Sequence, residues 1–329
     1  DANGAGNTYE DITAVLAPGY DPVEEPDCSH TSFGRHIDEI FDTDLNAHVF
    51  RFFIHTTPDN DRCINVDRQR NEIKTYDKSP DNLLGIEDEI VVYKWKFKID
   101  SDFQVSSSFT HIHQLKSVGG SLASMPMYTL TLRKSSPDRL ELRYAETSSQ
   151  ITLKQTDLDP FKGVWVEVTE TIQYGTSGYY SIEIKKVDDG AVLFDYTNNS
   201  IVNWRPNAEF IRPKWGIYRS LNSEEDLRDE EVLFANFSIE EVNTLYVDEF
   251  SKGDAIKIYP NPSKDSLLIS EKTLNSYHSL KIINQLGQTI ITENQAKKTI
   301  DISKLSKGIY NVVFTKNNTK VASKKLIIQ

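Results

Sequence analysis

Apolar and polar residues alternate along much of the chain between about residues 47 and 240. The alternating segments are HVFRFFIHT, EIVVYKWKFKI, SSSFTHIHQL, MYTLTLRK, RLELRYAE, VWVEVTETIQY, YYSIEIKKV, KWGIYRS and EVLFANFSIEEV. A period of two predicts strands that bury one face. Turn-forming stretches such as SSPDR, YGTSG and VDDGA separate them, and no stretch of a dozen residues has a convincing helical period. The pattern therefore predicts an all-β sandwich.

The alternation stops near the polar stretch YVDEFSKGDA, and a new β pattern begins at IKIYPNP. We place the boundary at about 248–254, which gives a first domain over residues 1–248 and a second over 255–329. A chain of 329 residues is long enough for one large and one small core. The first 45 residues are less regular, and we expect them to wrap the edge of the sandwich.

Charge changes at the same place. From Lys252 onward the sequence has 13 lysines, no arginine and five acidic residues, a charge of +8; because the whole chain carries -12, the preceding 251 residues carry -20. An acidic first domain argues against nucleic acid as a partner, because binding to the phosphate backbone needs a broad basic face. A polyanion would need positive charge gathered in one cleft.

Cys28 and Cys63 are the two cysteines. In an oxidising compartment they would form a disulfide that closes a loop of about 36 residues, worth roughly 3–4 kcal/mol in the chain-entropy model. The alternative is two unpaired buried thiols. Neither cysteine has the C-x-x-C spacing of a redox or zinc site.

The C-terminal segment reads IYPNPSKDSLLIS, LKIINQLGQTII and IDISKLSKGIYNVVFTKNNTKVASKKLIIQ. It resembles the C-terminal sorting domain of proteins exported by the type IX secretion system of Bacteroidetes. The resemblance implies a small Ig-like β-sandwich, the secretion machinery as a partner, a secreted or cell-surface location, and a leader peptide already removed. A lysine-rich carbohydrate-binding module is the alternative. No apolar run approaches the roughly 18 residues of a membrane span, so we expect none.

Three segments of the first domain place polar residues at alternate positions of a predicted strand. Within each segment the alternate residues share a face of the sheet. These sets are Arg70, Glu72 and Lys74; His111 and His113; and Arg212, Lys214 and Tyr218. Together they supply cations, imidazoles and a phenol.

This inventory suits β-elimination from a uronic acid. The C5 proton lies next to a carboxylate, and its removal is difficult until donors such as Arg or His neutralise that charge. A base must take the proton, and an acid must protonate the departing O4 oxygen. We expect Arg70 and His111 to neutralise, His113 to abstract and Tyr218 to protonate.

QRNEIK, HIH and KWGIY, in that order, resemble the three motif strands of jelly-roll alginate lyases. Longer stretches, including INVDRQRNEIKTYDKSPDNLLG and SSSFTHIHQLKSVGG, look closer to glucuronan lyases and especially ulvan lyases. The resemblance implies a β-jelly roll, endo-acting lyase activity, and the same roles for Arg70, His111, His113 and Tyr218. The sequence departs from the alginate-lyase motif where His111 stands in place of glutamine and Arg212 in place of a tyrosine.

The partner implied is an acidic, sulfated algal polysaccharide. Ulvan contains both glucuronate, whose C5 proton and O4 leave from one side, and iduronate, in which they lie on opposite faces. Sulfate and carboxylate groups would need further contacts. The candidates for substrate binding are Arg51, His55, Glu72, Lys74, Lys116, Arg212, Lys214 and Arg219.

Other interpretations remain open. His111 and His113 could be a structural pair or two metal ligands, with His55 as the third; His55 could also line the cleft or be the base. We expect no cofactor, apart from a possible structural calcium ion, and a monomer. His30, His36, His48 and His278 have no such neighbours in the sequence and are expected to be structural or on the surface. Glucuronan or alginate lyases, a non-catalytic carbohydrate-binding jelly roll, and a hydrolase of the same fold are alternative functions.

Overall fold

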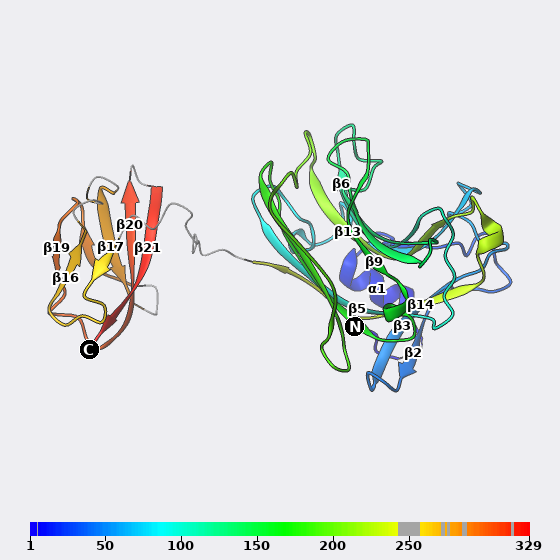
Figure 1. The fold of residues 1–329 in the computed structure, drawn as a ribbon, viewed down its shortest axis with the longest axis horizontal. Coiled ribbons are helices and arrows are strands. Elements are labelled where there is room, and N and C mark those ends of the chain that lie inside the picture. Colours follow the sequence, from blue (N-terminus) through cyan, green and yellow to red (C-terminus); the bar gives the residue numbers. More distant parts are fainter. Residues whose placement is uncertain (5, 243–256, 271–273, 275–276, 285–287, 317–318) are drawn as a thin grey trace. The chain divides into compact units, whose positions relative to one another are not determined.

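The computed structural model describes the chain except for residues 5, 243–256, 271–273, 275–276, 285–287 and 317–318 (Figure 1). The chain divides into two compact units, Asp1–Asn243 and Thr244–Gln329. The predicted boundary at 248–254 lies outside the described residues.

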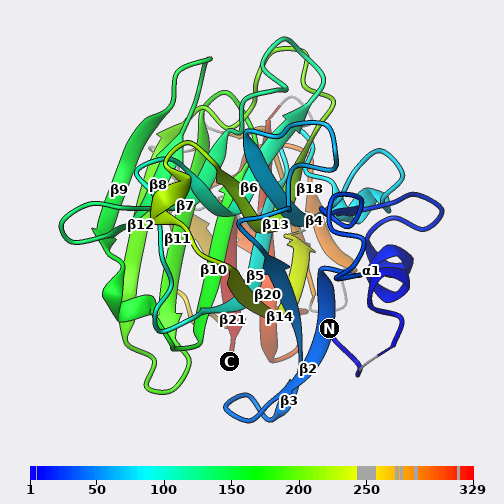
Figure 2. The same ribbon diagram turned by 90° about the vertical axis from the view of Figure 1, so that its right-hand side faces the viewer.

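The first unit is a β-jelly roll made of two antiparallel sheets, each with seven strands (Figure 2). In order across sheet A lie β1 (Val23–Glu24), β4 (Arg68–Lys74), β13 (Phe210–Ser220), β6 (Thr110–Val118), β7 (Tyr128–Arg133), β8 (Arg139–Tyr144) and β9 (Ile151–Asp157). In order across sheet B lie β12 (Val192–Ile201), β11 (Gly178–Lys186), β10 (Val166–Gln173), β5 (Ile90–Ile99), β14 (Glu230–Glu241), β3 (Ala47–Ile54) and β2 (Ile37–Asp42).

The core lies between the two sheets, where the alternation predicts it. Along β5, every second residue from Val91 to Ile99 is fully or almost fully buried. Sheet A contributes Trp215 of β13, whose ring lies 6.0 Å from that of Trp95 of β5. Burial of such large side chains is the main stabilising contribution in a sandwich of this kind.

The middle of sheet A is buried on both faces, and not only on the face toward the core. Six consecutive residues of β6, from Thr110 to Leu115, are buried, and so are all residues of β13 except Arg212. The polar residues on the side that faces away from the core are therefore largely shielded from water. Buried polar groups need partners, so this side must carry an organised network.

The N-terminal segment contains a helix that the sequence analysis did not predict. Helix α1 (Thr8–Leu16) has nine residues, too few for a helical period to stand out over a dozen residues, and it buries Ile12. Short 3-10 helices η1 (Asp81–Leu83), η2 (Asp159–Phe161) and η3 (Glu224–Asp226) connect strands. The predicted disulfide is confirmed: Cys28 and Cys63 are bonded, with their Cα atoms 6.2 Å apart.

The second unit is a small Ig-like sandwich. One sheet contains β15 (Ile258–Tyr259), β16 (Ser266–Ile269) and β19 (Thr299–Asp301), and the other contains β18 (Thr289–Glu293), β17 (Ser279–Ile283), β20 (Gly308–Lys316) and β21 (Thr319–Ile328). Leu267, Leu280 and Phe314 are among the residues of its separate core. In the described parts of both units, no helix is long and apolar enough to span a membrane.

Candidate active site

The three strands with polar faces lie side by side in sheet A, with β13 between β4 and β6. Tyr218 is paired with Arg70 on one side and with His111 on the other. We call the side of these strands that faces away from sheet B the β4–β13–β6 face. It carries Arg70, Glu72, Lys74, His111, Gln114, Lys116, Arg212, Lys214 and Tyr218.

Two buried carboxylates organise the basic side chains at one end of this face. Glu72 contacts Lys214 at 2.6 Å and is also paired with Arg70. Glu24 of β1 contacts Lys74 at 2.8 Å and is also paired with Lys214. Burial opposes ionisation of Glu72, but Lys214 and Arg70 hold its pKa below the usual value. Arg70, Lys74 and Lys214 are thus neutralised by the protein itself.

Arg70 has a further partner that the sequence analysis missed. Its Nε donates to Asp61 at 2.9 Å, and Asp61 lies in the loop between β3 and β4. The guanidinium carbon of Arg70 stands 3.6 Å from the ring centre of Tyr218. Asp61 therefore helps to fix the cation against the phenol ring.

Tyr218 contacts Arg68 and lies near His111. Arg68, which the sequence analysis did not select, donates from Nη1 to the Tyr218 hydroxyl at 3.1 Å. The rings of His111 and Tyr218 have centroids 5.9 Å apart, and Phe109 stacks on His111 at 4.8 Å. Because the hydroxyl oxygen accepts from Arg68, the phenol proton itself is left available for another acceptor.

His111 is buried and neutral. Burial lowers its pKa to about 3, with the nearby Arg133, Arg70 and Arg143 acting in the same direction. Its Nδ1 has no hydrogen-bond partner among the described residues. His111 can therefore exchange a proton or donate a hydrogen bond, but it does not supply the positive charge that we expected of it.

At the other end of the face, two cations are free of carboxylates. Arg212 is paired across the strands with Lys116, and neither forms an ion pair within the described part of the chain. The Nε and Nη1 atoms of Arg212 are buried without hydrogen-bond partners, while its guanidinium packs 4.5 Å from the ring of Tyr76. Burial, together with Lys214 and Arg212, lowers the pKa of Lys116 to about 8. This pair is suited to accept an anion.

His113, the predicted base, is on the wrong side of the sheet. Its Nε2 lies 2.9 Å from Glu170 of β10 in sheet B, and its Nδ1 lies 3.0 Å from the backbone oxygen of Lys214. Its ring packs 4.4 Å from Trp95 in the core. Both ring nitrogens are therefore engaged between the sheets, and His113 does not reach the β4–β13–β6 face.

A register irregularity explains the error. The pairing of β6 with both β7 and β13 shifts between His111 and His113, as at a β-bulge. An extra residue in a strand reverses which face the following side chains take. Gln114 consequently joins His111 on the polar face, where its Nε2 donates to Glu72.

Three further candidates for substrate binding lie away from this face. Arg51 is on β3 of sheet B and pairs with Asp38 at 2.7 Å. Arg219 points to the opposite side of β13 from Tyr218, is fully buried, and donates to Gln69 at 2.7 Å. His55 follows β3 and contacts Asp59 at 3.0 Å.

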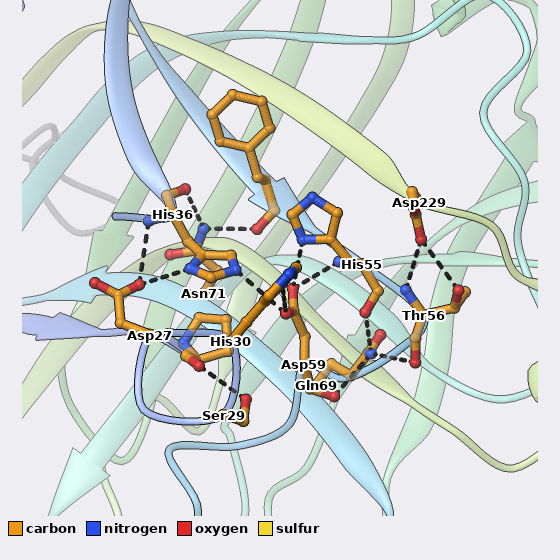
Figure 3. A network of polar contacts seen from close by, with 12 residues as sticks. Asp27, Ser29, His30, His36, His55, Thr56, Asp59, Gln69, Asn71 and Asp229 are labelled. Carbon is orange, nitrogen blue, oxygen red and sulfur yellow. Dashed lines mark hydrogen bonds and ion pairs between the residues drawn. The ribbon is translucent and has the colours of Figure 1, made fainter. Parts of the chain in front are cut away.

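His55 belongs to a cluster with His30, His36 and Asp59 that could hold a metal ion (Figure 3). His30 and His36 were expected to be structural or on the surface, without such neighbours. Within the residues that the structure describes, the β4–β13–β6 face contains no comparable group of metal-ligating side chains.

Comparisons with known proteins find a short alignment with one polysaccharide lyase and distant structural likenesses to others. A curated endo-acting ulvan lyase from Formosa agariphila is 34% identical over 92 residues, which are 27% of this chain and 18% of that protein. The aligned stretch thus spans less than a fifth of the relative. Two solved structures with low sequence identity are also similar. An endo-beta-1,4-glucuronan lyase from Trichoderma reesei is 14% identical with a TM-score of 0.47, covering 69% of this chain and 92% of that one. A PL-14 alginate lyase from Aplysia kurodai is 13% identical with a TM-score of 0.45, covering 63% and 87%.

The second unit is assigned more directly. Residues 257–329 match the family described as the secretion system C-terminal sorting domain. The predicted export tail is confirmed, and the second unit is a sorting domain that marks an exported or cell-surface protein.

Proposed function

We propose that the first unit is an endo-acting polysaccharide lyase that cleaves next to a uronic acid by β-elimination, and that its substrate is ulvan. The observation that carries the proposal is the placement of Tyr218 between Arg70 and His111, with Arg68 on its hydroxyl. A proton donor, a neutral imidazole and positive charge are the groups that this reaction requires.

In the proposed reaction, His111 replaces His113 as the base. The neutral His111 takes the proton from C5, and the electron pair forms the double bond between C4 and C5. Tyr218 gives its proton to O4, which leaves with the other half of the polymer. Arg68, which is partly exposed and already reaches the Tyr218 hydroxyl, stabilises the negative charge that develops at the carboxylate during proton removal. Arg70 stays bound to Asp61 and Glu72 and holds the Tyr218 ring in place.

The low pKa of His111 in the free protein is compatible with this role. A nearby negative charge favours the protonated form of an imidazole. Binding of a uronate carboxylate next to His111 would raise its pKa from about 3 and make it a stronger base. The substrate would thus help to activate the residue that attacks it.

Both epimers of the uronic acid fit this arrangement. Iduronate, whose C5 proton and O4 lie on opposite faces, needs two residues, and His111 and Tyr218 provide them. In glucuronate both groups leave from one side, so a single residue, Tyr218, can take the C5 proton and then give a proton to O4.

Arg212 and Lys116 extend the proposed site along the polymer. Lys116 is five residues from His111 on β6, which is roughly 16 Å at a rise of about 3.3 Å per residue. A single sugar cannot reach both places. We assign this pair to a carboxylate or sulfate on a neighbouring sugar, consistent with cleavage inside a chain. The choice of ulvan is supported by the short alignment with the Formosa agariphila ulvan lyase.

The test is incubation of the purified chain with ulvan, glucuronan and alginate. We expect ultraviolet absorbance from an unsaturated uronate with ulvan, and less or none with the other two polymers. Absorbance with glucuronan or alginate alone would refute the ulvan assignment. Polymer binding without absorbance would favour a carbohydrate-binding module, and new reducing ends without absorbance would favour a hydrolase.

A further inference from the structure

Three histidines approach a single carboxylate near the N-terminal side of β4. Nδ1 of His30 lies 2.9 Å from Asp59, Nε2 of His36 lies 3.2 Å from the same oxygen, and Nδ1 of His55 lies 3.0 Å from the other oxygen. The four potential ligand atoms are all within 4.8 Å of one another. Figure 3 shows the three rings converging on Asp59.

These side chains come from segments that the fold brings together. His30 and His36 belong to the segment before β2, whereas His55 and Asp59 follow β3. The Cys28–Cys63 disulfide joins the same two segments, because Cys28 lies two residues before His30 and Cys63 four residues after Asp59. The ligand atoms are thus held together by a covalent link.

The cluster also has the outer support that metal sites commonly have. The second ring nitrogen of His36, Nδ1, lies 2.6 Å from Asp27, so a carboxylate fixes the orientation of this ring. The hydroxyl of Tyr9 in turn donates to Asp27 at 3.0 Å. With Nδ1 held in this way, Nε2 of His36 is directed at the centre of the cluster.

Strand β4 supports the backbone around the same point. Gln69 donates to the backbone oxygen of Asp59 at 2.9 Å, and Asn71 donates to that of His36 at 2.7 Å. The side chains of His36 and Asp59 are completely buried, while His30 and His55 are 18% and 17% exposed. The cluster is therefore enclosed on most sides and reachable from one.

Ligand type selects the ion. Three imidazole nitrogens and one carboxylate oxygen suit Zn²⁺, whereas Ca²⁺ and Mg²⁺ prefer sets made of oxygen atoms. Tetrahedral zinc with bonds of about 2.0–2.1 Å places its ligand atoms roughly 3.3 Å apart. The nitrogens of His30 and His36 lie 2.9 and 3.2 Å from one Asp59 oxygen, close to this spacing, and that of His55 lies 3.0 Å from the other oxygen. All four ligand atoms lie within 4.8 Å of one another, so the longest separations must shorten by about 1.5 Å around a bound ion.

We propose that His30, His36, His55 and Asp59 bind one Zn²⁺ ion in a four-ligand structural site. The ion ties the N-terminal segment to the loop after β3. This loop also carries Asp61, whose carboxylate lies 2.9 Å from Nε of Arg70. By fixing the loop, the ion would also help to position Arg70 on the β4–β13–β6 face. The proposal replaces our expectation of no cofactor beyond calcium, and it does not depend on the proposed lyase function.

The test is metal analysis of the full chain. The protein is treated with a chelator, incubated with excess ZnCl₂, freed of unbound metal, and measured by mass spectrometry of the elements. We expect one zinc per wild-type chain, and less than a tenth of that in His55→Ala. His48→Ala is the matched control: His48 is an exposed histidine of β3 outside the cluster, and this variant should retain one zinc.

Two further measurements distinguish loss of a zinc ligand from misfolding of the variant. Asp27→Asn leaves all four ligands in place and should weaken zinc binding about 10–100-fold, as loss of a supporting carboxylate does elsewhere. Co²⁺ in place of Zn²⁺ should give the strong visible absorption of a tetrahedral site in wild type and not in His55→Ala. A wild-type chain that retains no zinc, or a His55→Ala variant that is folded by circular dichroism and retains a full equivalent, would overturn the proposal.

Discussion

The two sides of strand β4 support different polar clusters. On the outer side, Arg70, Glu72 and Lys74 carry charge and are joined to Glu24, Asp61 and Lys214 in an ion-pair network. On the inner side, Gln69 and Asn71 are neutral amides that donate to the backbone around the histidine cluster. The outer side can present charge to a ligand, whereas the inner side fixes the course of a loop.

The outer side itself contains two kinds of cation. Lys214 is tied to Glu72 at 2.6 Å, but Arg212, two residues away on the same strand, has no carboxylate partner in the described part of the chain. A cation that is paired with a buried carboxylate contributes mainly to the stability of the native fold, because loss of its partner would leave a buried, unpaired charge. A free cation contributes to ligand binding. The following changes separate these roles.

The largest expected effect is on turnover. Tyr218→Phe removes the proposed proton donor while keeping the ring against Arg70, and it should lower the rate of unsaturated-product formation by about 10²–10⁴-fold. Binding of the polymer, measured by calorimetry, should be nearly unchanged. Tyr179→Phe on β11 is the control and should keep the wild-type rate; a Tyr218→Phe variant that does the same would exclude Tyr218 as the acid.

The next effect is on stability. Glu72→Gln removes one of the buried carboxylates that balance Lys214 and Arg70, while Glu24 and Asp61 remain. We expect it to lower the free energy of unfolding by about 3 kcal/mol, the lower end of the range for breaking a buried ion pair. Urea denaturation measures this change. Glu183→Gln removes a half-exposed carboxylate that pairs with Lys185 and should change stability by about 0.5 kcal/mol or less. Equal effects of the two substitutions would contradict the assigned role of the network.

Arg212→Ala tests the free cation. Loss of a charge-assisted contact of about 1.5–3 kcal/mol should weaken the binding of ulvan about 10–100-fold, with little loss of stability. Arg51→Ala, on sheet B and paired with Asp38, should leave polymer affinity unchanged. If Arg51→Ala weakens binding as much as Arg212→Ala does, the polymer does not bind on the β4–β13–β6 face.

The smallest effect concerns pH. The pKa of His111 is about 3 in the folded protein and 6.5 in the reference state, so between these values the unfolded chain binds more protons. The stabilising contribution of neutral His111 is therefore complete above pH 6.5 and is lost as the pH falls toward 3. Between pH 7 and 5 the loss should be on the order of 1–2 kcal/mol.

Urea denaturation at both pH values, with His111→Gln and the exposed-site control His48→Gln, isolates this contribution. The pH dependence should be weaker in His111→Gln than in wild type and unchanged in His48→Gln. Identical pH dependence in all three proteins would show that His111 is not buried in its neutral form.

The central strands could be predicted from the sequence, but the edge strands could not. All nine alternating segments correspond to strands of the two large sheets. Strand β4 is outside these segments and was found from its polar residues Arg70, Glu72 and Lys74. The remaining strands, β1, β9, β12 and β2, are the ones at the ends of the sheets. An edge strand buries less on its two faces, as the largely exposed β9 shows, so its residues need not alternate.

The sequence predicted which strands carry the candidate site, but not which face of the sheet every side chain takes. Arg70 and Tyr218 lie together because β4 and β13 are regular where they pair. His113 was misplaced because an irregularity in β6 leaves no mark in residue type. Glu24, Asp61 and Arg68 were missed because their roles depend on which strands and loops become neighbours. If the alternation of faces is shifted by one residue after His111 in the HIHQ segment, Gln114 falls on the same face as His111.

The histidine cluster shows the same limit. His30, His36 and His55 are spread over 26 positions without a recognised metal motif, and only the folded chain brings them to Asp59. The disulfide, predicted from two cysteines and the export tail, was the sequence signal that could have located them, because it joins the two segments that carry the cluster.

The most direct test of the central claim is mass spectrometry of the products that the wild-type chain releases from ulvan. We predict oligosaccharides that end in an unsaturated uronate and are therefore lighter by one water molecule than hydrolysis products of the same composition. Products of the hydrolytic mass, or intact polymer after prolonged incubation with folded protein, would contradict the assignment of Tyr218, Arg70 and His111 to a lyase site.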